Sequence, residues 1–219
     1  MRKLLVIGFL VGYFTQILGY AYQSQNHPLL EQRRNKLLGI YGSFARAESD
    51  SKLSIEGFDT QNFDLSENQL GLGIQIGYLL SSNHRILLDL GHFFKKNGFS
   101  YDIFTLGYAF TPVLPNTQSW RLLLGANAGI ARANFDSGSF TVNDSSLESL
   151  TYTGFTFGVK AGLLYELEFG ELEFGVQARR LNFGEKSGTL DINGTPTNTQ
   201  LDLSKTSNVG VYFGYNQLF

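Results

Sequence analysis

Residues 208 to 219 alternate between two kinds of side chain, and this alternation strongly limits the folds open to the chain. In an extended strand, successive side chains point to opposite faces. One face of this segment is therefore apolar, and the other is small and mostly polar. The apolar face carries Val209, Val211, Phe213, Tyr215 and Phe219, and the other carries Asn208, Gly210, Tyr212, Gly214, Asn216 and Leu218. Such a strand suits a barrel with a lipid-contacting outside and a polar inside.

The same period of two returns in eight segments that are separated by turns. Their apolar faces lie within residues 38–44, 70–78, 86–94, 104–110, 120–130, 155–165, 172–178 and 209–219. A soluble sandwich would also alternate, but its exposed face would carry Lys, Glu and Thr instead of recurrent glycine. Because glycine weakens an ordinary strand, its persistence on one face indicates the crowded interior of a narrow cylinder. We predict an all-β fold over residues 36–219, an eight-stranded antiparallel transmembrane β-barrel with up-and-down meander topology.

The composition agrees with a small membrane barrel and excludes several other classes. The 219 residues include 25 glycines and 14% aromatics, which suit a tight interior and membrane interfaces, respectively. The chain has no cysteine, so disulfides and thiolate metal sites are excluded. A formal charge of −2 without a basic stripe gives no sign of a nucleic-acid partner. We expect no cofactor, no metal and a monomer.

The N-terminus has the pattern of a secretory signal. Two basic residues precede an apolar run that ends at small residues: Arg2, Lys3, residues 4 to 18, Gly19 and Ala21. We predict that residues 1–21 are a cleaved signal peptide and that the polar residues 22–35 are a periplasmic lead-in. The alternative is an uncleaved anchor helix, although Thr15 and Gln16 interrupt the apolar run. No cysteine follows the cleavage position, so lipoprotein processing is excluded.

The links between the predicted strands alternate in length. Short links lie at residues 81–83, 112–118 and 167–170, and longer ones at 47–67, 95–100, 133–150 and 184–207. Outer-membrane barrels have short periplasmic turns and longer surface loops, which predicts extracellular loops and two periplasmic termini. Outward aromatic residues fall near the short links, at the level expected for lipid headgroups. They are Tyr78, Phe110, Trp120, Tyr165 and Phe219.

The inward positions of the predicted strands carry four charges of each sign. They are Arg85, Arg121, Lys160 and Arg179 against Asp89, Glu166, Glu171 and Glu173. Charges in a narrow, poorly hydrated lumen are costly unless they are paired, so this balance predicts an ion-paired plug. We expect Asp89, Lys160, Glu173 and Arg179 near its middle. The same residues could instead line a selective pore or a gate, although eight strands leave room for little more than side chains.

An enzymatic reading rests on one histidine. A hydrolase needs a nucleophile, a base and an orienting acid within hydrogen-bond reach. Of the three histidines, only His92 is expected near the outer rim, with Ser100 and Asp102 on the adjacent strand. A partly exposed histidine at the rim far more often packs at the membrane interface, and the sequence has no histidine-rich metal cluster. We predict no catalytic residue.

Two of the longer links suggest surface functions. In the last hairpin, Leu190 and Ile192 continue the outward parity of the seventh strand, and Leu201 and Leu203 continue that of the eighth, with a turn signal at Asn193-Gly194. This segment is either a ribbon that could pair edge-on with another protein or a mobile loop. Residues 47–67 carry six acidic residues against Lys52 alone and could be bridged by divalent ions to lipopolysaccharide, but they contain no EF-hand spacing.

The C-terminal pattern of Val211, Phe213, Tyr215 and Phe219 resembles the assembly signal read by the outer-membrane barrel insertion machinery. With the eight-stranded plan, the chain resembles the OmpA-like and OmpX-like outer-membrane β-barrel superfamily of Gram-negative bacteria. Gln217 departs from the apolar preference of that signal. The resemblance implies an outer-membrane location, with lipid, lipopolysaccharide and the insertion machinery as partners, but it specifies destination rather than activity.

These observations leave three function classes. The first is a non-enzymatic barrel with a plugged lumen that acts through its extracellular loops in adhesion, host interaction or envelope integrity, with a surface protein or host ligand as partner. The second is a narrow pore for small solutes or ions. The third is an outer-leaflet lipid-modifying enzyme.

Overall fold

A computed structural model describes residues 35–55, 60–96, 98–117, 119–135, 141–142, 145–146, 150–192, 195–203 and 205–219. The predicted signal peptide and nearly all of the lead-in lie outside these residues. The described elements are all strands: β1 Lys36–Ile55, β2 Gln61–Ser81, β3 His84–Lys96, β4 Phe99–Phe110, β5 Trp120–Phe135, β6 Thr141–Val142, β7 Ser145–Ser146, β8 Leu150–Glu166, β9 Gly170–Asn182, β10 Glu185–Ile192, β11 Thr195–Asp202 and β12 Thr206–Leu218. In this part of the chain, no helix is long and apolar enough to cross a membrane.

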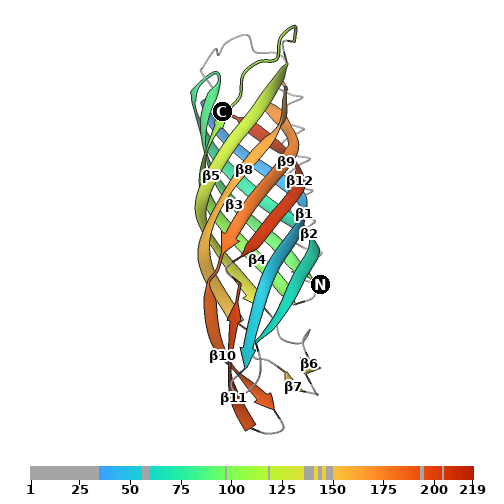
Figure 1. The fold of residues 1–219 in the computed structure, drawn as a ribbon. Helices are drawn as coiled ribbons and strands as arrows, with labels where there is room; N and C mark the ends of the chain where they lie inside the picture. The colour runs from blue at the N-terminus through green and yellow to red at the C-terminus, as the bar shows by residue number, and fades with distance from the viewer. Residues whose placement is uncertain are drawn as a thin grey trace, which may run out of the picture. The chain divides into compact units, whose positions relative to one another are not determined.

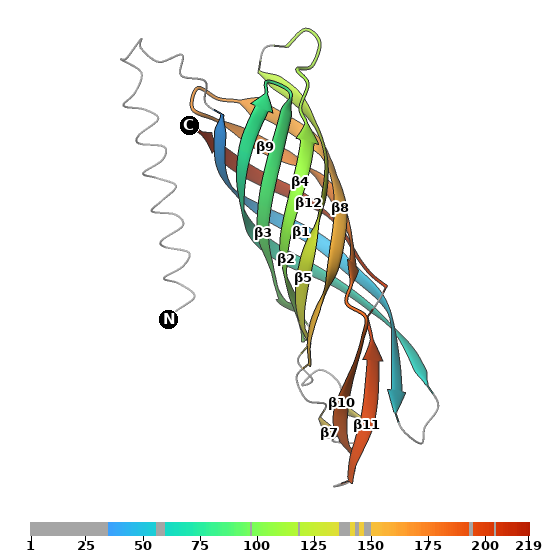
Figure 2. The same ribbon diagram turned by 90° about the vertical axis from the view of Figure 1, so that its left-hand side faces the viewer.

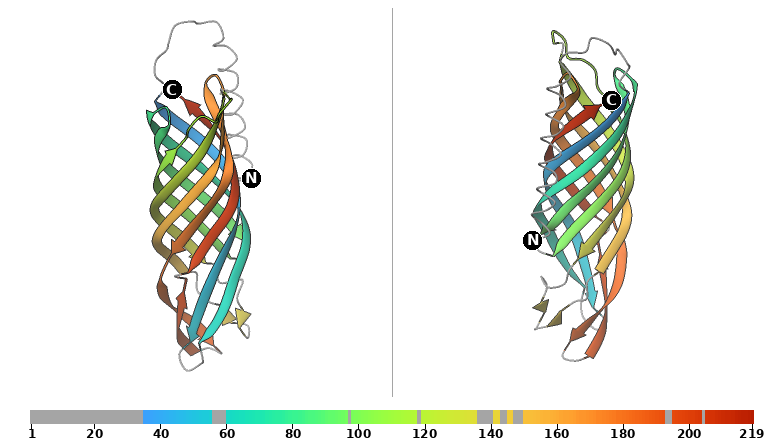
Figure 3. Two further views of the ribbon diagram at one scale, coloured as in Figure 1. Left: turned by 45° about the horizontal axis from the view of Figure 1, so that its top comes forward. Right: turned by 180° about the vertical axis from the view of Figure 1, so that it is seen from behind.

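Eight of these strands close into an antiparallel barrel, as the sequence predicts (Figures 1 and 3). Around the barrel the order is β1, β2, β3, β4, β5, β8, β9 and β12, and β12 returns to β1. The closure is visible at Ile40, which lies opposite Ile74 of β2 on one side and Tyr215 of β12 on the other. Every strand of the ring therefore has two hydrogen-bonded neighbours, and the ring has no free edge.

The predicted faces of the strands are confirmed. Leu70, Leu106 and Phe155 point outward and are 62%, 60% and 77% exposed, whereas inward Gln75 and Glu173 are 2% and 1% exposed. The exposed apolar side chains surround the barrel, which is the arrangement that a lipid-facing surface requires. The observed architecture is an all-β, eight-stranded transmembrane barrel.

The expected loop at residues 47–67 is instead largely strand, and residues 184–207 contain the paired ribbon that was one of the two alternatives for them. β1 and β2 remain paired from the barrel wall out to Leu53 opposite Gln61. β10 and β11 form a second hairpin, and β11 also pairs with the end of β1, where Lys52 lies opposite Asp202. Figure 2 shows these strands continuing beyond the barrel at one end, here called the long-hairpin end. The prediction of a loop at residues 47–67 was wrong because a paired ribbon in water can be polar on both faces. Such a ribbon then shows no hydrophobic period in its sequence.

The link predicted as long at residues 95–100 is also different, because it is a tight hairpin turn. Lys96 lies opposite Phe99, and Gly98 has a φ of 82°. Glycine enters this left-handed region without a steric penalty, so it allows the chain to reverse within two residues.

The outward parity predicted for Leu201 and Leu203 is wrong. Both side chains are buried, at 2% and 0% exposure. Leu203 lies between β11 and β12, outside either strand, so the alternation of β12 does not carry through to β11. The side chains of Leu190 and Ile192 and the whole of Asn193-Gly194 lie outside what the structure describes, although β10 and β11 do form the expected hairpin.

The interior is not polar throughout, which corrects the sequence-based expectation. At the long-hairpin end, the inward positions form an apolar cluster, here called the apolar cap. It consists of Ala45, Ala47, Phe93, Phe99, Tyr101, Ile103, Ala131, Ala133, Phe135, Tyr152, Leu181, Phe183, Leu201 and Leu203, with Leu150 packed against it. Phe93 and Tyr101 stack with their ring centroids 4.3 Å apart. Aromatic and aliphatic side chains thus fill this end of the lumen.

Candidate functional site

The inward charges come from β3, β5, β8 and β9, where alternation places them on the lumen side of the wall. The end of the barrel that carries the links at residues 82–83, 111–119 and 167–169 is here called the short-turn end. β1 begins and β12 ends at this same end, since Leu37 lies opposite Leu218 and Lys36 opposite Tyr78. From this end toward the apolar cap, the charges form pairs at successive levels.

Two pairs lie nearest the short-turn end. Arg121 pairs with Glu166, and its Nη1 donates to the carbonyl of Ser82 at 2.8 Å. Arg85 pairs with Glu171 through both terminal nitrogens, with both side chains almost fully buried. A guanidinium that meets a carboxylate with two nitrogens fixes the orientation as well as the distance of the two groups.

The next level centres on Glu173. The Lys160 ammonium donates to Glu173 Oε1 at 2.8 Å, and Glu173 Oε2 accepts from Gln75 Nε2 at 2.9 Å and Asn216 Nδ2 at 3.0 Å. Gln75 Nε2 also donates to Asn216 Oδ1 at 2.7 Å. Lys160 additionally lies 5.7 Å from the ring centroid of Tyr212. The Glu173 carboxylate is thereby neutralised from β8 and hydrogen-bonded to side chains of β2 and β12. Because β2 is not a neighbour of β9, these bonds cross the lumen.

The third level joins Asp89 to β1 and β9. Asp89 Oδ1 accepts a hydrogen bond from the Tyr41 hydroxyl at 2.5 Å, and Asp89 Oδ2 lies 3.3 Å from Arg179 Nη2. The Tyr41 ring lies over Gly73 and its hydroxyl over Gly91, where a β-carbon would collide with it. Glycine at these two wall positions therefore makes room for the tyrosine that reaches Asp89.

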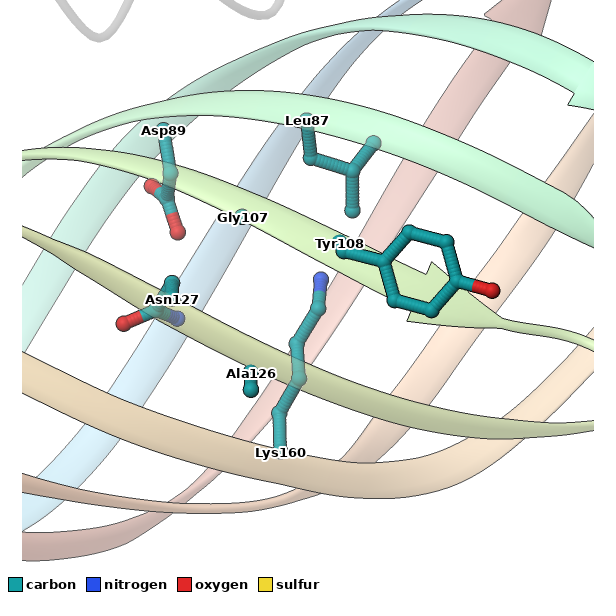
Figure 4. Close-up of a pocket in the computed structure, with 7 residues that line it drawn as sticks. All are labelled: Leu87, Asp89, Gly107, Tyr108, Ala126, Asn127 and Lys160. Atoms are coloured by element: carbon teal, nitrogen blue, oxygen red, sulfur yellow. The ribbon is translucent and has the colours of Figure 1, made fainter.

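A small cavity of about 10 Å³ lies beside the second and third levels. Figure 4 shows its lining residues, with Lys160 extending from β8 toward Leu87. Its lining residues are Leu87, Asp89, Gly107, Tyr108, Ala126, Asn127 and Lys160. That volume is about the smallest that holds one water molecule. The arrangement can neutralise charge in the lumen and hold it in place.

The structure brings Arg85, Asp89, Arg121, Lys160, Glu173 and Arg179 into pairs, with Glu166 and Glu171 as the remaining partners. Sequence reasoning did not single out Tyr41, Gln75 or Asn216, which complete the network. The available signal was their position, since all three are polar groups on the inward face of otherwise clear strands. No group of three or more metal-binding side chains occurs among the residues that the structure describes.

His92 lies on the outward face of β3, as expected. Its Nδ1 lies 2.6 Å from Asp102 Oδ1, and both side chains are about half exposed. The His92 ring also meets Phe94 edge-on, at 5.0 Å between centroids. Ser100 is on the same strand as Asp102, but no hydrogen bond joins it to His92 in the structure. The geometry therefore joins His92 to an acidic side chain on the outward face of β3 and β4.

The C-terminal strand presents its apolar pattern outward. Val211 and Phe213 are more than half exposed, and Tyr215 is intermediate, with Phe219 following the end of β12. Near the same end of the barrel, Trp120 packs against Tyr165 at 4.9 Å between ring centroids. These rings lie where the interfacial aromatic residues were predicted.

No protein-family model matches this chain, and no curated protein matches it. Among solved structures, the chain is similar to the outer membrane protein OprG from Pseudomonas aeruginosa, with 15% identity and a TM-score of 0.51 over 83% of this chain and 95% of OprG. It is also similar to Neisserial surface protein A (17% identity, TM-score 0.49, 83% of this chain and 97% of that chain) and to AlkL (15% identity, TM-score 0.48, 90% and 96%). The likeness to OprG concerns the fold, which is that of outer-membrane β-barrels.

Proposed function

We propose that this protein is a non-enzymatic barrel of the bacterial outer membrane whose lumen is sealed and whose extended hairpins contact partners outside the cell. The observation that carries the proposal is the series of obstructions in the lumen. Three buried ion pairs, Arg85–Glu171, Lys160–Glu173 and Arg179–Asp89, are followed by the apolar cap. A solute would have to displace both kinds of obstruction.

The long-hairpin end offers the binding surface. There β11 pairs with both β10 and β1, so two hairpins combine into one sheet beyond the barrel wall. A paired sheet holds its side chains in fixed positions, which lowers the entropy lost on binding relative to a flexible loop. This supports a role in adhesion or host interaction, with a surface protein or host ligand as partner.

The outward face near the same end supports contact with lipopolysaccharide. Arg132 and Arg180 are exposed there, and Arg180 lies opposite Phe157 in the lipid-facing belt. Cationic side chains directly beyond an apolar belt can meet anionic headgroups while their stems stay against lipid. We propose on this basis that the long-hairpin end is extracellular and that the chain termini are periplasmic.

Planar-bilayer recording of the refolded protein tests the sealed lumen. We expect insertion without stable single-channel steps at 100 mV. A narrow pore, which is the second candidate, would instead give steps of uniform size, and their ion preference would change in Arg179→Gln or Glu173→Gln. Such steps in the unmodified protein would contradict the proposal.

A further inference from the structure

Several inward polar side chains near Asp89 and Arg179, here called the polar layer, are incompletely hydrogen-bonded within the described part of the protein. Inward side chains from five strands each have at least one buried nitrogen or oxygen without a hydrogen-bond partner among the described residues. They are Ser43 of β1, Thr105 of β4, Asn127 of β5, Thr156 of β8, and Gln177 and Arg179 of β9. Asn208 of β12 adds a sixth strand. The unpartnered atoms of this group thus come from six of the eight strands of the barrel, while Gln69, Arg85, Tyr101 and Tyr212 carry others elsewhere in the lumen.

Within this layer, Arg179 and Asn208 have the most buried atoms without a hydrogen-bond partner. Arg179 uses Nη2 for Asp89, while its Nε and Nη1 have no partner. Asn208 lies directly opposite Arg179 on the neighbouring strand, is 0% exposed, and has neither Nδ2 nor Oδ1 bonded. On the other side, Arg179 lies opposite Gly158, which has no side chain to act as an acceptor.

Among the described residues, the Oδ1 atoms of Asn208 and Asn127 are acceptors without a partner, and neither is hydrogen-bonded to Arg179. The neighbours toward the long-hairpin end belong to the apolar cap, including Ala131 and Leu181. Toward the short-turn end, the carboxylates are already bonded to Tyr41, Gln75, Lys160 and Asn216. Buried polar groups in proteins nearly always have a partner, which can be a bound water or ion.

We propose that Arg179 and Asn208 form an internal binding site for a compact hydrogen-bond acceptor, either water or an anion of halide size. The free donors are the two guanidinium nitrogens, the carboxamide of Asn208 and that of Gln177. Because Arg179 is neutralised by a single contact of 3.3 Å to Asp89, its remaining positive field also favours an electronegative ligand. A larger ligand does not fit, since eight strands leave an interior filled by side chains.

A crystal structure from bromide-containing solution, measured at the bromine absorption edge, tests the site directly. An anomalous peak within hydrogen-bond distance of Arg179 Nε or Nη1 identifies an anion site, and ordered density there without anomalous signal identifies water. Both results support the proposal. If the layer is empty, or if Arg179 turns to bond protein acceptors with both nitrogens, the proposal is overturned.

The stability of two matched variants gives a second test. Asn216→Leu removes a fully bonded asparagine on the same strand, and it should lower the urea midpoint of unfolding in lipid vesicles. If Asn208 is bonded to a ligand, Asn208→Leu should lower the midpoint as well. If its carboxamide is truly unsatisfied, replacing it with an apolar side chain should raise the midpoint, which would contradict the proposed site. Neither outcome depends on whether the hairpins bind a partner.

Discussion

At the scale of single residues, the contribution of each ion pair in the lumen to stability depends on two opposing effects. Desolvation of the two charges costs free energy, and their mutual attraction offsets that cost. Removing two charges from water costs several kcal/mol per ion, and their mutual attraction compensates only when further hydrogen bonds complete the geometry. Glu173 meets this condition, because Lys160, Gln75 and Asn216 all donate to it. Such a pair contributes little net stability, but loss of one member leaves the other uncompensated.

Glu173→Gln should therefore destabilise the barrel strongly. We expect a loss of about 3 to 5 kcal/mol in the free energy of unfolding, because the buried Lys160 ammonium loses its counter-charge. Urea unfolding in lipid vesicles measures the change. The matched control is Glu48→Gln, whose ion pair with Arg46 is exposed on both sides and should contribute no more than about 1 kcal/mol. Equal effects of the two substitutions would show that Glu173 is not buried against Lys160.

The sequence predicts which charges face inward, but not how the network is completed. The alternation in β3, β8 and β9 places Asp89, Lys160 and Glu173 on the lumen side. Gln75 and Glu173, however, are 98 residues apart and lie on strands that are not neighbours. Their contact depends on the curvature and stagger of the closed ring, for which no local pattern exists.

At the scale of elements, the sequence predicts the membrane-spanning parts of the strands but not where the strands end. Lipid requires one face to be apolar, which gives β2 a clear period from Leu70 to Tyr78. Beyond the membrane the same strand continues to Gln61 with water on its surface, and the constraint disappears. The apolar cap was missed for a related reason, since Phe93, Tyr101 and Phe135 lie at strand ends, where inward aromatic residues break the expected polar face.

Neighbouring phenylalanines on β3 test the assignment of the cap. Phe93 is 1% exposed inside it, whereas Phe94 is 44% exposed on the outer face. Phe93→Ala should cost about 3 to 5 kcal/mol in the free energy of unfolding, because it leaves a cavity among buried side chains. Phe94→Ala, in contrast, loses contacts with lipid and the edge-on contact with the half-exposed His92 ring, and it should cost clearly less. Urea unfolding of both variants in vesicles decides the matter, and a larger effect of Phe94→Ala would reverse the assigned faces of β3.

At the scale of the whole molecule, closure explains why the sequence alone predicts the fold. Each backbone group in a membrane must be bonded within the protein, so strands can cross lipid only in a closed ring. This requirement imposes the alternation on the membrane-spanning part of each of the eight strands in the ring. Closure does not constrain which side chains fill the lumen. The hydrogen bonds of the ion-paired levels and the apolar cap were therefore found only in the structure.

The central claim is a sealed cylinder that is apolar outside and packed inside, and spin-label accessibility in bilayers tests it most directly. The chain has no cysteine, so one introduced cysteine carries one nitroxide. Labels at the outward positions Ile74 and Leu106 should relax with oxygen dissolved in lipid, and labels at the inward positions Gln75 and Thr105 should be shielded from both oxygen and a water-soluble nickel chelate. Access of the chelate to the inward labels, or shielding of the outward labels from oxygen, would contradict the sealed cylinder.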